Sequence, residues 1–235
     1  MTTSTSEQPP VHLQAPRRMR RRWARWSMVV VGCALLLLGI QQGRRLLTHN
    51  LDVVEPGRLY RSAQLDAEDL EKTIRQFGIR TLVNLRGPNP KQTWYWEERD
   101  VCRKLGVRHL DVLWSARALP KPERVSALLA AYREGPYPML IHCRAGADRT
   151  GLAAALYLID QKQHSVSTAQ DTSLNLAHGH LALYPTWAMD EFLILFNKSG
   201  KSLSAWVQED YPSIYLSESK EGRWASLVDS WRSEE

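Results

Sequence analysis

The sequence predicts an α/β fold of three layers, in which a mainly parallel sheet of about four to five strands is flanked by helices. Short runs of β-type residues alternate with amphipathic segments from about residue 53 onwards, an order typical of parallel strands joined by helices. The 235 residues suffice for one such domain with short extensions. A composition of 43% hydrophobic and 24% charged residues is that of a globular chain.

The first half of the domain is predicted to alternate strand and helix. Residues 58–61 form a first strand, and Asp66 can cap a helix that ends at Gly78. The apolar residues of this helix recur at three- and four-residue spacing: Leu70, Ile74 and Phe77. Residues 79–85 form the next strand, and a loop with two prolines follows it.

The second half continues the alternation. A helix is expected over about 94–105, ended by Gly106, and a strand over 107–113. Pro122 suits the first turn of the following helix. Residues 139–142 are a short apolar strand of the buried type.

The chain after residue 143 is predicted to be mostly helical, with helices at about 150–161, 167–177 and 185–197. We therefore place one domain over residues 50–197. Residues 198–235 form a C-terminal extension that either packs as an added helix or stays loose.

The basic charge of the chain lies in its N-terminal part. Residues 1–45 hold eight arginines against one acidic residue, a net of +7, and subtracting this from the total of +6 leaves −1 for residues 46–235. No basic surface for nucleic acid is therefore expected on the folded part. Residues 1–22 are predicted to be a basic, unfolded cytoplasmic tail.

An apolar run over residues 26–40 follows the arginines. A membrane-spanning helix needs about 20 residues, a length that is reached if the helix begins at residue 23 and Arg25 snorkels. We predict an uncleaved signal-anchor transmembrane helix over 23–42. The alternatives are a cleaved secretory signal, for which a good small-residue cleavage pattern is lacking, and a buried helix of the domain.

The arginines around this run set its predicted orientation. Six precede it, and only Arg44 and Arg45 follow it closely, so the N-terminus is expected in the cytoplasm. The protein would then be a single-pass protein of the inner membrane, with its folded domain in the periplasm.

The most informative segment is residues 142–151, HCRAGADRTG. A buried strand delivers Cys143 into a tight loop, Arg149 follows six positions later, and a helix begins at once. Ligands bind at the carboxyl ends of strands in an open α/β sheet, and a loop that enters a helix N-terminus directs N–H groups at an anion. We therefore expect phosphate to be bound by the loop residues Arg144, Ala145, Gly146 and Ala147.

Two residues of this segment are assigned separate tasks. Arg149 can hold two phosphate oxygens with its planar guanidinium, and the same positive field lowers the pKa of Cys143, which makes it a nucleophilic thiolate at neutral pH. This chemistry requires no metal and no cofactor. The plainer alternative, an inert thiol and a surface arginine, leaves the surrounding pattern unexplained.

Residues 142–151 resemble the active-site signature of the protein tyrosine and dual-specificity phosphatase superfamily. Residues 59–64 (LYRSAQ) and 81–86 (TLVNLR) further resemble a bacterial, often membrane-anchored, branch of dual-specificity-like phosphatases. The likeness covers about residues 53–195. It implies a compact α/β fold, metal-independent hydrolysis through a phosphocysteine intermediate, and help from Thr150 in turnover of that intermediate.

The general acid departs from the family pattern. Family members carry an aspartate on a mobile upstream loop, whereas residues 114–119 contain no carboxylate. Asp148 is one candidate, because myotubularin-like lipid phosphatases have an aspartate just before the loop arginine; stabilising the loop is its alternative role. Asp111 is the other, although it falls in a predicted strand, where a structural role is favoured.

Two further features are ambiguous. Arg86 and Arg144 could extend the anionic site beyond one phosphate or be solvated charges. His178 and His180 have no third ligand at a suitable spacing, so they are interpreted as structural and no metal site is predicted.

These observations predict a metal-independent phosphomonoester hydrolase of the tyrosine or dual-specificity type, acting on a phosphorylated protein. One alternative is a phosphatase for phosphoinositides or other polyphosphorylated small molecules. An alternative of another class is a phosphate-recognising binding module with little turnover.

Overall fold

The computed structural model describes residues 17–182 and 186–220. The chain divides into two units, Met1–Gly43 and Arg44–Glu235. Helix α1 (Arg17–Thr48) contains the described part of the first unit and ends inside the second. Among the described residues, no helix combines the length and the apolar character needed to cross a membrane, so the span predicted over 23–42 is not supported. A helix does form there, but its apolar run, 26–40, is shorter than a span requires.

The folded unit is built on a five-stranded sheet in the order β1-β2-β5-β3-β4. Strands β2, β5, β3 and β4 are parallel, and β1 pairs antiparallel with β2 at the edge. The mainly parallel sheet predicted from the sequence is confirmed, whereas β1 was not foreseen. The strand bounds are β1 (Asp52–Glu55), β2 (Leu59–Ser62), β3 (Thr81–Asn84), β4 (Arg108–Asp111) and β5 (Met139–His142).

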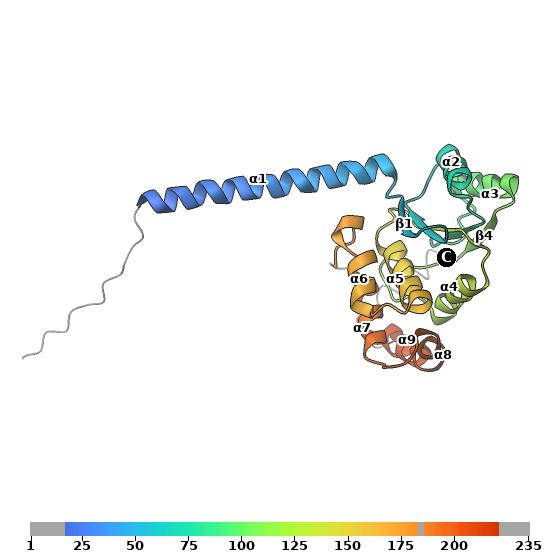
Figure 1. The fold of residues 1–235 in the computed structure, drawn as a ribbon. Helices are drawn as coiled ribbons and strands as arrows, with labels where there is room; N and C mark the ends of the chain where they lie inside the picture. The colour runs from blue at the N-terminus through green and yellow to red at the C-terminus, as the bar shows by residue number, and fades with distance from the viewer. Residues whose placement is uncertain (1–16, 183–185, 221–235) are drawn as a thin grey trace, which may run out of the picture. The chain divides into compact units, whose positions relative to one another are not determined.

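Helices cover both faces of the sheet because neighbouring strand residues point to opposite sides. Leu140 of β5 packs with α2 (Ala67–Phe77) and α3 (Thr93–Leu105). The next residue, Ile141, belongs to the larger core on the other face, built with α4 (Pro122–Glu134) and α5 (Asp148–Lys162). In Figure 1 the sheet lies between the helices labelled α2 and α3 and those labelled α4 and α5. The structure is therefore the three-layer arrangement that the alternation of strands and helices predicted.

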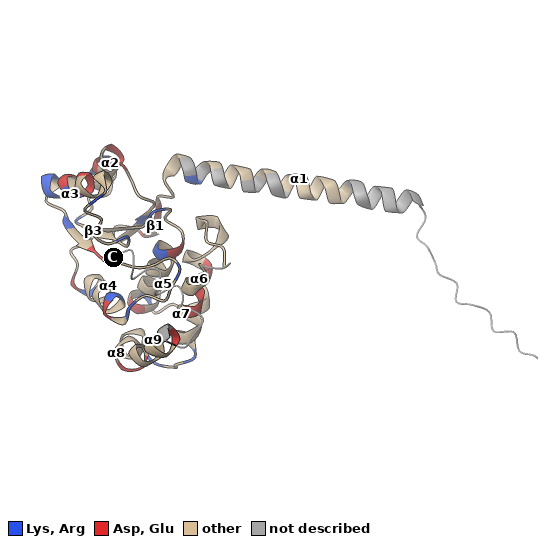
Figure 2. Ribbon diagram, turned by 180° about the vertical axis from the view of Figure 1, so that it is seen from behind, with Lys and Arg blue, Asp and Glu red and all other residues tan. Residues whose placement is uncertain are grey.

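Local signals set the ends of the helices as expected. Asp66 accepts a hydrogen bond from the N–H of Asp69 at 2.8 Å and caps α2, which ends at Gly78 with a φ of 62°. Gly106 ends α3 with a φ of 68°. Acidic and basic residues alternate over the helices of this unit (Figure 2), in keeping with its near-neutral formal charge.

The remaining helices follow α5 in the chain. They are α6 (Val166–Ser173), the 3-10 helix η1 (Leu176–His178), α7 (Ala188–Asn197), α8 (Leu203–Glu209) and α9 (Tyr211–Lys220). The helix predicted over 167–177 thus ends earlier, and the one predicted from 185 begins later.

The C-terminal extension joins the core as far as it is described. Phe192 of α7 contacts the rings of Trp206 and Tyr211, with centroids 5.3 and 4.9 Å away. The Tyr211 hydroxyl also donates to the carbonyl of Pro120 at 2.6 Å. Of the two possibilities for this extension, packing against the core is observed as far as Tyr215, and α9 continues to Lys220. Trp224 and Trp231 lie outside the described residues.

Candidate active site

Cys143 lies at the carboxyl end of β5, the middle strand of the sheet. Helix α5 begins five residues later, at Asp148, so the loop 143–147 connects the sheet to a helix N-terminus. This position combines a strand end with the positive end of a helix dipole, where an anion is favoured.

Three consecutive carbonyl groups of the loop, at residues 144–146, accept hydrogen bonds from the segment before α2. The N–H of Gln64 donates to the first at 3.3 Å, Asn50 Nδ2 to the second at 3.1 Å, and Arg61 Nη2 to the third at 2.8 Å. A trans peptide holds its C=O and N–H in opposite directions. The loop N–H groups are therefore directed away from these donors, and the N–H of Ala145 lowers the pKa of Cys143.

Gly146 makes this loop conformation sterically possible. Its φ is 67°, and a Cβ atom there would lie 2.6 Å from the nitrogen of Ala63 and 2.8 Å from the carbonyl carbon of Ser62. Both facts favour glycine, because larger residues rarely adopt this φ and have no space here. The tight turn predicted at Gly146 is present, and it rests directly on the end of β2.

The Cys143 thiol is buried, with 3% of its surface exposed. Burial alone raises the pKa of the thiol. The Arg149 charge, the Thr150 hydroxyl and the backbone N–H groups of Thr150 and Ala145 outweigh burial, so the pKa of Cys143 is lowered overall. A lowered pKa increases the fraction of the nucleophilic thiolate.

Arg149 is held by the loop that follows β4. Its Nη1 donates to the carbonyl of Trp114 at 3.2 Å. Its Nε is buried, and within the described part of the chain it has no hydrogen-bond partner. An unpaired buried donor is costly, so Arg149 retains capacity to bind an anion beside the thiol.

Asp148 contacts a histidine that the sequence did not connect with it. His180 Nδ1 lies 2.8 Å from Asp148 Oδ1, and His180 Nε2 lies 2.8 Å from Asp190 Oδ2. Burial lowers the pKa of His180, but the two carboxylates outweigh it and raise the pKa to about 9. At neutral pH an imidazolium therefore joins the start of α5 to α7. His180 was interpreted only as structural, and its separation of 32 positions from Asp148 gave no local signal.

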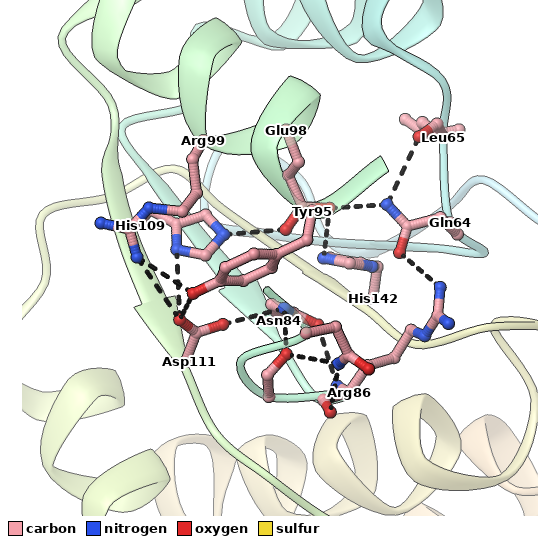
Figure 3. A network of polar contacts seen from close by, with 12 residues as sticks. Gln64, Leu65, Asn84, Arg86, Tyr95, Glu98, Arg99, His109, Asp111 and His142 are labelled. Atoms are coloured by element: carbon pink, nitrogen blue, oxygen red, sulfur yellow. Dashed lines mark hydrogen bonds and ion pairs between the residues drawn. The ribbon is translucent and has the colours of Figure 1, made fainter. Parts of the chain in front are cut away.

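Asp111 lies in a polar network on the α3 side of the sheet (Figure 3). Its Oδ1 accepts from Asn84 Nδ2 at 2.8 Å, and its Oδ2 accepts from the Tyr95 hydroxyl at 2.6 Å. Arg99 lies 3.7 Å from Oδ2. Since both carboxylate oxygens are engaged at the end of β4, these contacts favour the structural role of Asp111.

Glu98, which was not predicted as a site residue, is the centre of the same network (Figure 3). Its carboxylate lies 2.8 Å from His109 Nε2 and 3.2 Å from His142 Nε2, and it accepts from Gln64 Nε2 at 2.6 Å. A signal was present, because Glu98 falls at helical spacing among the buried residues of α3: Tyr95, Val101 and Cys102. A carboxylate on an apolar helix face usually has a specific partner.

Arg144 belongs to the loop 143–147, and Arg86 shares the electrostatic environment of Arg149 and Arg144. Arg86 stacks over the ring of Trp94 at 3.8 Å, and its Nη1 donates to Gln64 Oε1 at 3.2 Å. Burial lowers the pKa of Arg86, and the charges of Arg149 and Arg144 lower it further. Three arginines therefore share one electrostatic environment, which favours a ligand with substantial negative charge.

Among the residues that the structure describes, no group of three or more His, Cys, Asp or Glu side chains is arranged to hold a metal ion.

Known proteins resemble the same region of the chain. The tyrosine phosphatase family matches residues 43–160, about half of the sequence. A relative from Cupriavidus necator, named as a tyrosine-protein phosphatase, is 31% identical over 150 residues, which are 52% of this chain and 52% of the relative. The chain thus spans about half the length of this curated relative.

Solved structures share the fold. A protein of Shewanella putrefaciens described as a phosphatase is 23% identical with a TM-score of 0.51, and the match covers 63% of this chain and 93% of that one. The core catalytic domain of the PP-IP phosphatase SIW14 from S. cerevisiae is 18% identical with a TM-score of 0.52, covering 64% and 86%. The family match includes Cys143, Arg149 and the strands that position them, and the chain belongs to the tyrosine phosphatase family.

Proposed function

We propose that this protein is a metal-independent phosphomonoester hydrolase of the protein-tyrosine or dual-specificity type that uses Cys143 as its nucleophile. One observation carries the proposal. A buried thiol of lowered pKa precedes a loop whose carbonyl groups accept hydrogen bonds from Asn50 and Arg61, which leaves the loop N–H groups directed the opposite way. Such a loop can surround a phosphate dianion with N–H donors while the sulfur approaches phosphorus.

The reaction proceeds in two displacements. The Cys143 thiolate attacks phosphorus, an S–P bond forms, and the P–O bond to the leaving group breaks as an acid protonates the departing oxygen. Water then attacks the phosphocysteine and gives one proton to the carboxylate that acted as the acid, the S–P bond breaks, and phosphate leaves with the thiolate and the acid both restored. Arg149 and the loop N–H groups stabilise the transferring group in both steps, and Thr150 assists the second.

Asp148 is the proposed acid, in preference to Asp111. Both oxygens of Asp111 already accept short hydrogen bonds in the network of β4. Asp148 directly precedes Arg149, and because its Oδ1 contacts His180, the proton that it donates must be carried on Oδ2. A general acid must reach the leaving oxygen beside the transferring phosphoryl group, which suits a residue in the first turn of α5.

A second candidate keeps the chemistry and changes the substrate to a phosphoinositide or another polyphosphorylated small molecule. Arg86 supports it, because the stack on Trp94 and the bond to Gln64 hold a second guanidinium in the field of Arg149. A fixed cation beside the phosphate loop can bind a further phosphate group.

The test is turnover by the full chain without added metal, using a phosphotyrosine peptide, a phosphoserine peptide, a phosphoinositide and inorganic polyphosphate. We expect hydrolysis that survives EDTA and is abolished in Cys143→Ser, which should still bind phosphate analogues. Metal-dependent turnover or an active serine variant would contradict the proposal. Phosphate binding with little turnover would instead support the binding module.

The same assay separates the two substrate classes. If the polyphosphorylated substrate is the correct one, Arg86→Met should raise its KM about tenfold or more, by loss of a charge-assisted contact. The KM of the phosphotyrosine peptide should change much less. Exposed Arg80 provides a matched control variant, Arg80→Met. An equal effect on both substrates would count against the second candidate.

We further propose that the folded unit functions outside the cytoplasm, because arginines followed by an apolar run are the order found in export signals. A periplasmic alkaline phosphatase fused after Glu235 should be active, and a green fluorescent protein fused there should be dark. The reverse pattern would place the unit in the cytoplasm.

A further inference from the structure

Arg61 is a buried arginine of β2 that connects the catalytic loop to another part of the fold. Only 1% of its surface is exposed. Nη1 donates to the carbonyl of Ser173, the last residue of α6, at 2.7 Å, and Nη2 donates to the carbonyl of Gly146 at 2.8 Å. One planar guanidinium therefore fixes two backbone carbonyls from segments more than 80 positions away in sequence.

The bond to Gly146 sets the orientation of one loop peptide. With its C=O turned toward Arg61, the planar Gly146–Ala147 peptide must direct its N–H the opposite way, toward the side proposed to bind phosphate. The close approach of Gly146 to the end of β2 restricts the loop further. By bonding to the carbonyl of Gly146, Arg61 thus keeps the N–H of the next peptide directed toward the proposed phosphate position.

The charge of Arg61 also needs an anion. Burial lowers its pKa to about 10, so the guanidinium remains a cation at neutral pH. The negative charge of Cys143, and to a smaller extent that of Asp52, opposes the effect of burial and raises the pKa of Arg61. A buried cation is costly unless negative charge compensates it, and the Cys143 thiolate is the larger compensating charge.

We propose that Arg61 is a positioning residue of the phosphatase reaction, which holds the Gly146–Ala147 peptide with its N–H toward phosphate and favours the Cys143 thiolate by its buried charge. This inference rests on the proposed function. Residues 59–64 resemble a segment of dual-specificity-like phosphatases, but that resemblance assigned no role to Arg61.

Several charged or hydrogen-bonding groups influence the pKa of Cys143 or of Arg61, and they contribute to the pH dependence of Cys143 alkylation. Arg149 and Thr150 of α5 and the cation of Arg86 after β3 act on the thiol. Asp52 of β1 and His178 of η1 act on Arg61. His142 precedes the thiol and contacts Glu98 of α3. The variants below leave all these groups in place.

The test compares Arg61→Met, Arg61→Lys and a control, Arg108→Met, in the full chain. Arg108 Nη1 donates a similar bond, 2.9 Å long, to the carbonyl of Gly135, away from the catalytic loop. Alkylation of Cys143 by iodoacetamide is followed against pH by mass spectrometry of its peptide, which separates it from Cys33 and Cys102. Protection by inorganic phosphate is measured in parallel, and circular dichroism establishes folding.

We expect Arg61→Met to raise the pKa of Cys143, so that the pH at which alkylation is half-maximal moves upward, and to raise the phosphate concentration needed for protection about tenfold by disordering one loop donor. Arg61→Lys should keep most of the alkylation rate but weaken phosphate protection, because an ammonium cannot replace the two-pronged guanidinium. Arg108→Met should match the wild type in both measurements.

A folded Arg61→Met variant with wild-type alkylation and protection would overturn the inference. If Arg61→Met does not fold, Arg61→Lys decides: weakened phosphate protection supports the inference, and wild-type protection overturns it. Turnover is not measured, so the outcome is separate from the proposed function. That function is contradicted by a wild-type protein whose Cys143 has an ordinary pKa and no protection by phosphate.

Discussion

The Glu98 carboxylate lies 3.2 Å from Nε2 of His142, the residue directly before Cys143. Both side chains are almost fully buried. Burial raises the pKa of Glu98, but His142, His109 and Gln64 outweigh it, so its pKa is lowered well below the ordinary value. Helix α3 is thereby joined through an ionised carboxylate to β5, the strand that precedes Cys143.

Replacing Glu98 by glutamine should reduce the free energy of unfolding by about 2 kcal/mol, because the Gln64 amide and the largely buried His109 ring would lose the carboxylate that they contact at 2.6 and 2.8 Å. Urea unfolding at pH 7 measures this change. Exposed Glu97 gives the matched control, Glu97→Gln, which should stay within about 0.5 kcal/mol of the wild type. Equal stabilities of the two variants would show that the Glu98 contacts contribute nothing.

The contacts of His180 predict a pH dependence of stability at alkaline pH. Because its pKa is raised to about 9 in the folded protein from 6.5, the stabilisation is complete below pH 6.5 and disappears as pH rises through 9. The expected loss is on the order of 3 kcal/mol. His180→Gln should abolish this slope in urea titrations between pH 6 and 10, whereas the control His164→Gln should retain it. An unchanged slope in His180→Gln would assign the dependence to other groups.

Two cysteines should differ in reactivity, since the pKa of Cys143 is lowered while burial and the Glu98 charge raise the pKa of Cys102 to about 12. At pH 7 we expect iodoacetamide to label Cys143 at least about tenfold faster than Cys102. Peptide mass spectrometry provides the rates, and inorganic phosphate should slow the labelling of Cys143 alone. Comparable rates without phosphate protection would contradict the thiolate assignment.

The acid assignment predicts that Asp148→Asn lowers kcat by about 10²–10⁴ on alkyl phosphates. The loss should be small on activated aryl phosphates, whose leaving groups need no proton. Asp111→Asn should show no such dependence, because its oxygens serve the β4 network. If Asp111→Asn alone shows the leaving-group dependence, the assignment of the two aspartates must be reversed.

The parts of the structure that follow from local chemistry were predicted from the sequence. The strand Met139–His142 has the predicted bounds, and Asp66 and Gly78 end α2 as expected. The loop after β5 was predicted because glycine, cysteine and arginine each meet a local requirement there. These features depend on residues within about one turn or one strand of each other.

Features that depend on distant partners were missed. Strand β1 has a half-exposed pattern and pairs only with β2, so its sequence has little apolar periodicity. Glu98 acquires its role through His142, and His180 through Asp148 and Asp190. Arg61 acts on carbonyl groups 85 and 112 positions away. Only the folded chain brings these partners together.

The side-chain amide of Asn50 donates both to the carbonyl of Ala145 in the catalytic loop and to the carbonyl of His178, at 3.1 and 2.9 Å. Asn50 is two residues beyond the end of α1 and precedes the first strand. A shortened protein that starts at β1 would keep the whole sheet and still lose the donor that orients the Ala145–Gly146 peptide. A fragment that keeps the observed loop geometry must therefore begin at or before Asn50, and if the loop binds phosphate as proposed, a protease cut just after Asn50 should weaken that binding without unfolding the domain.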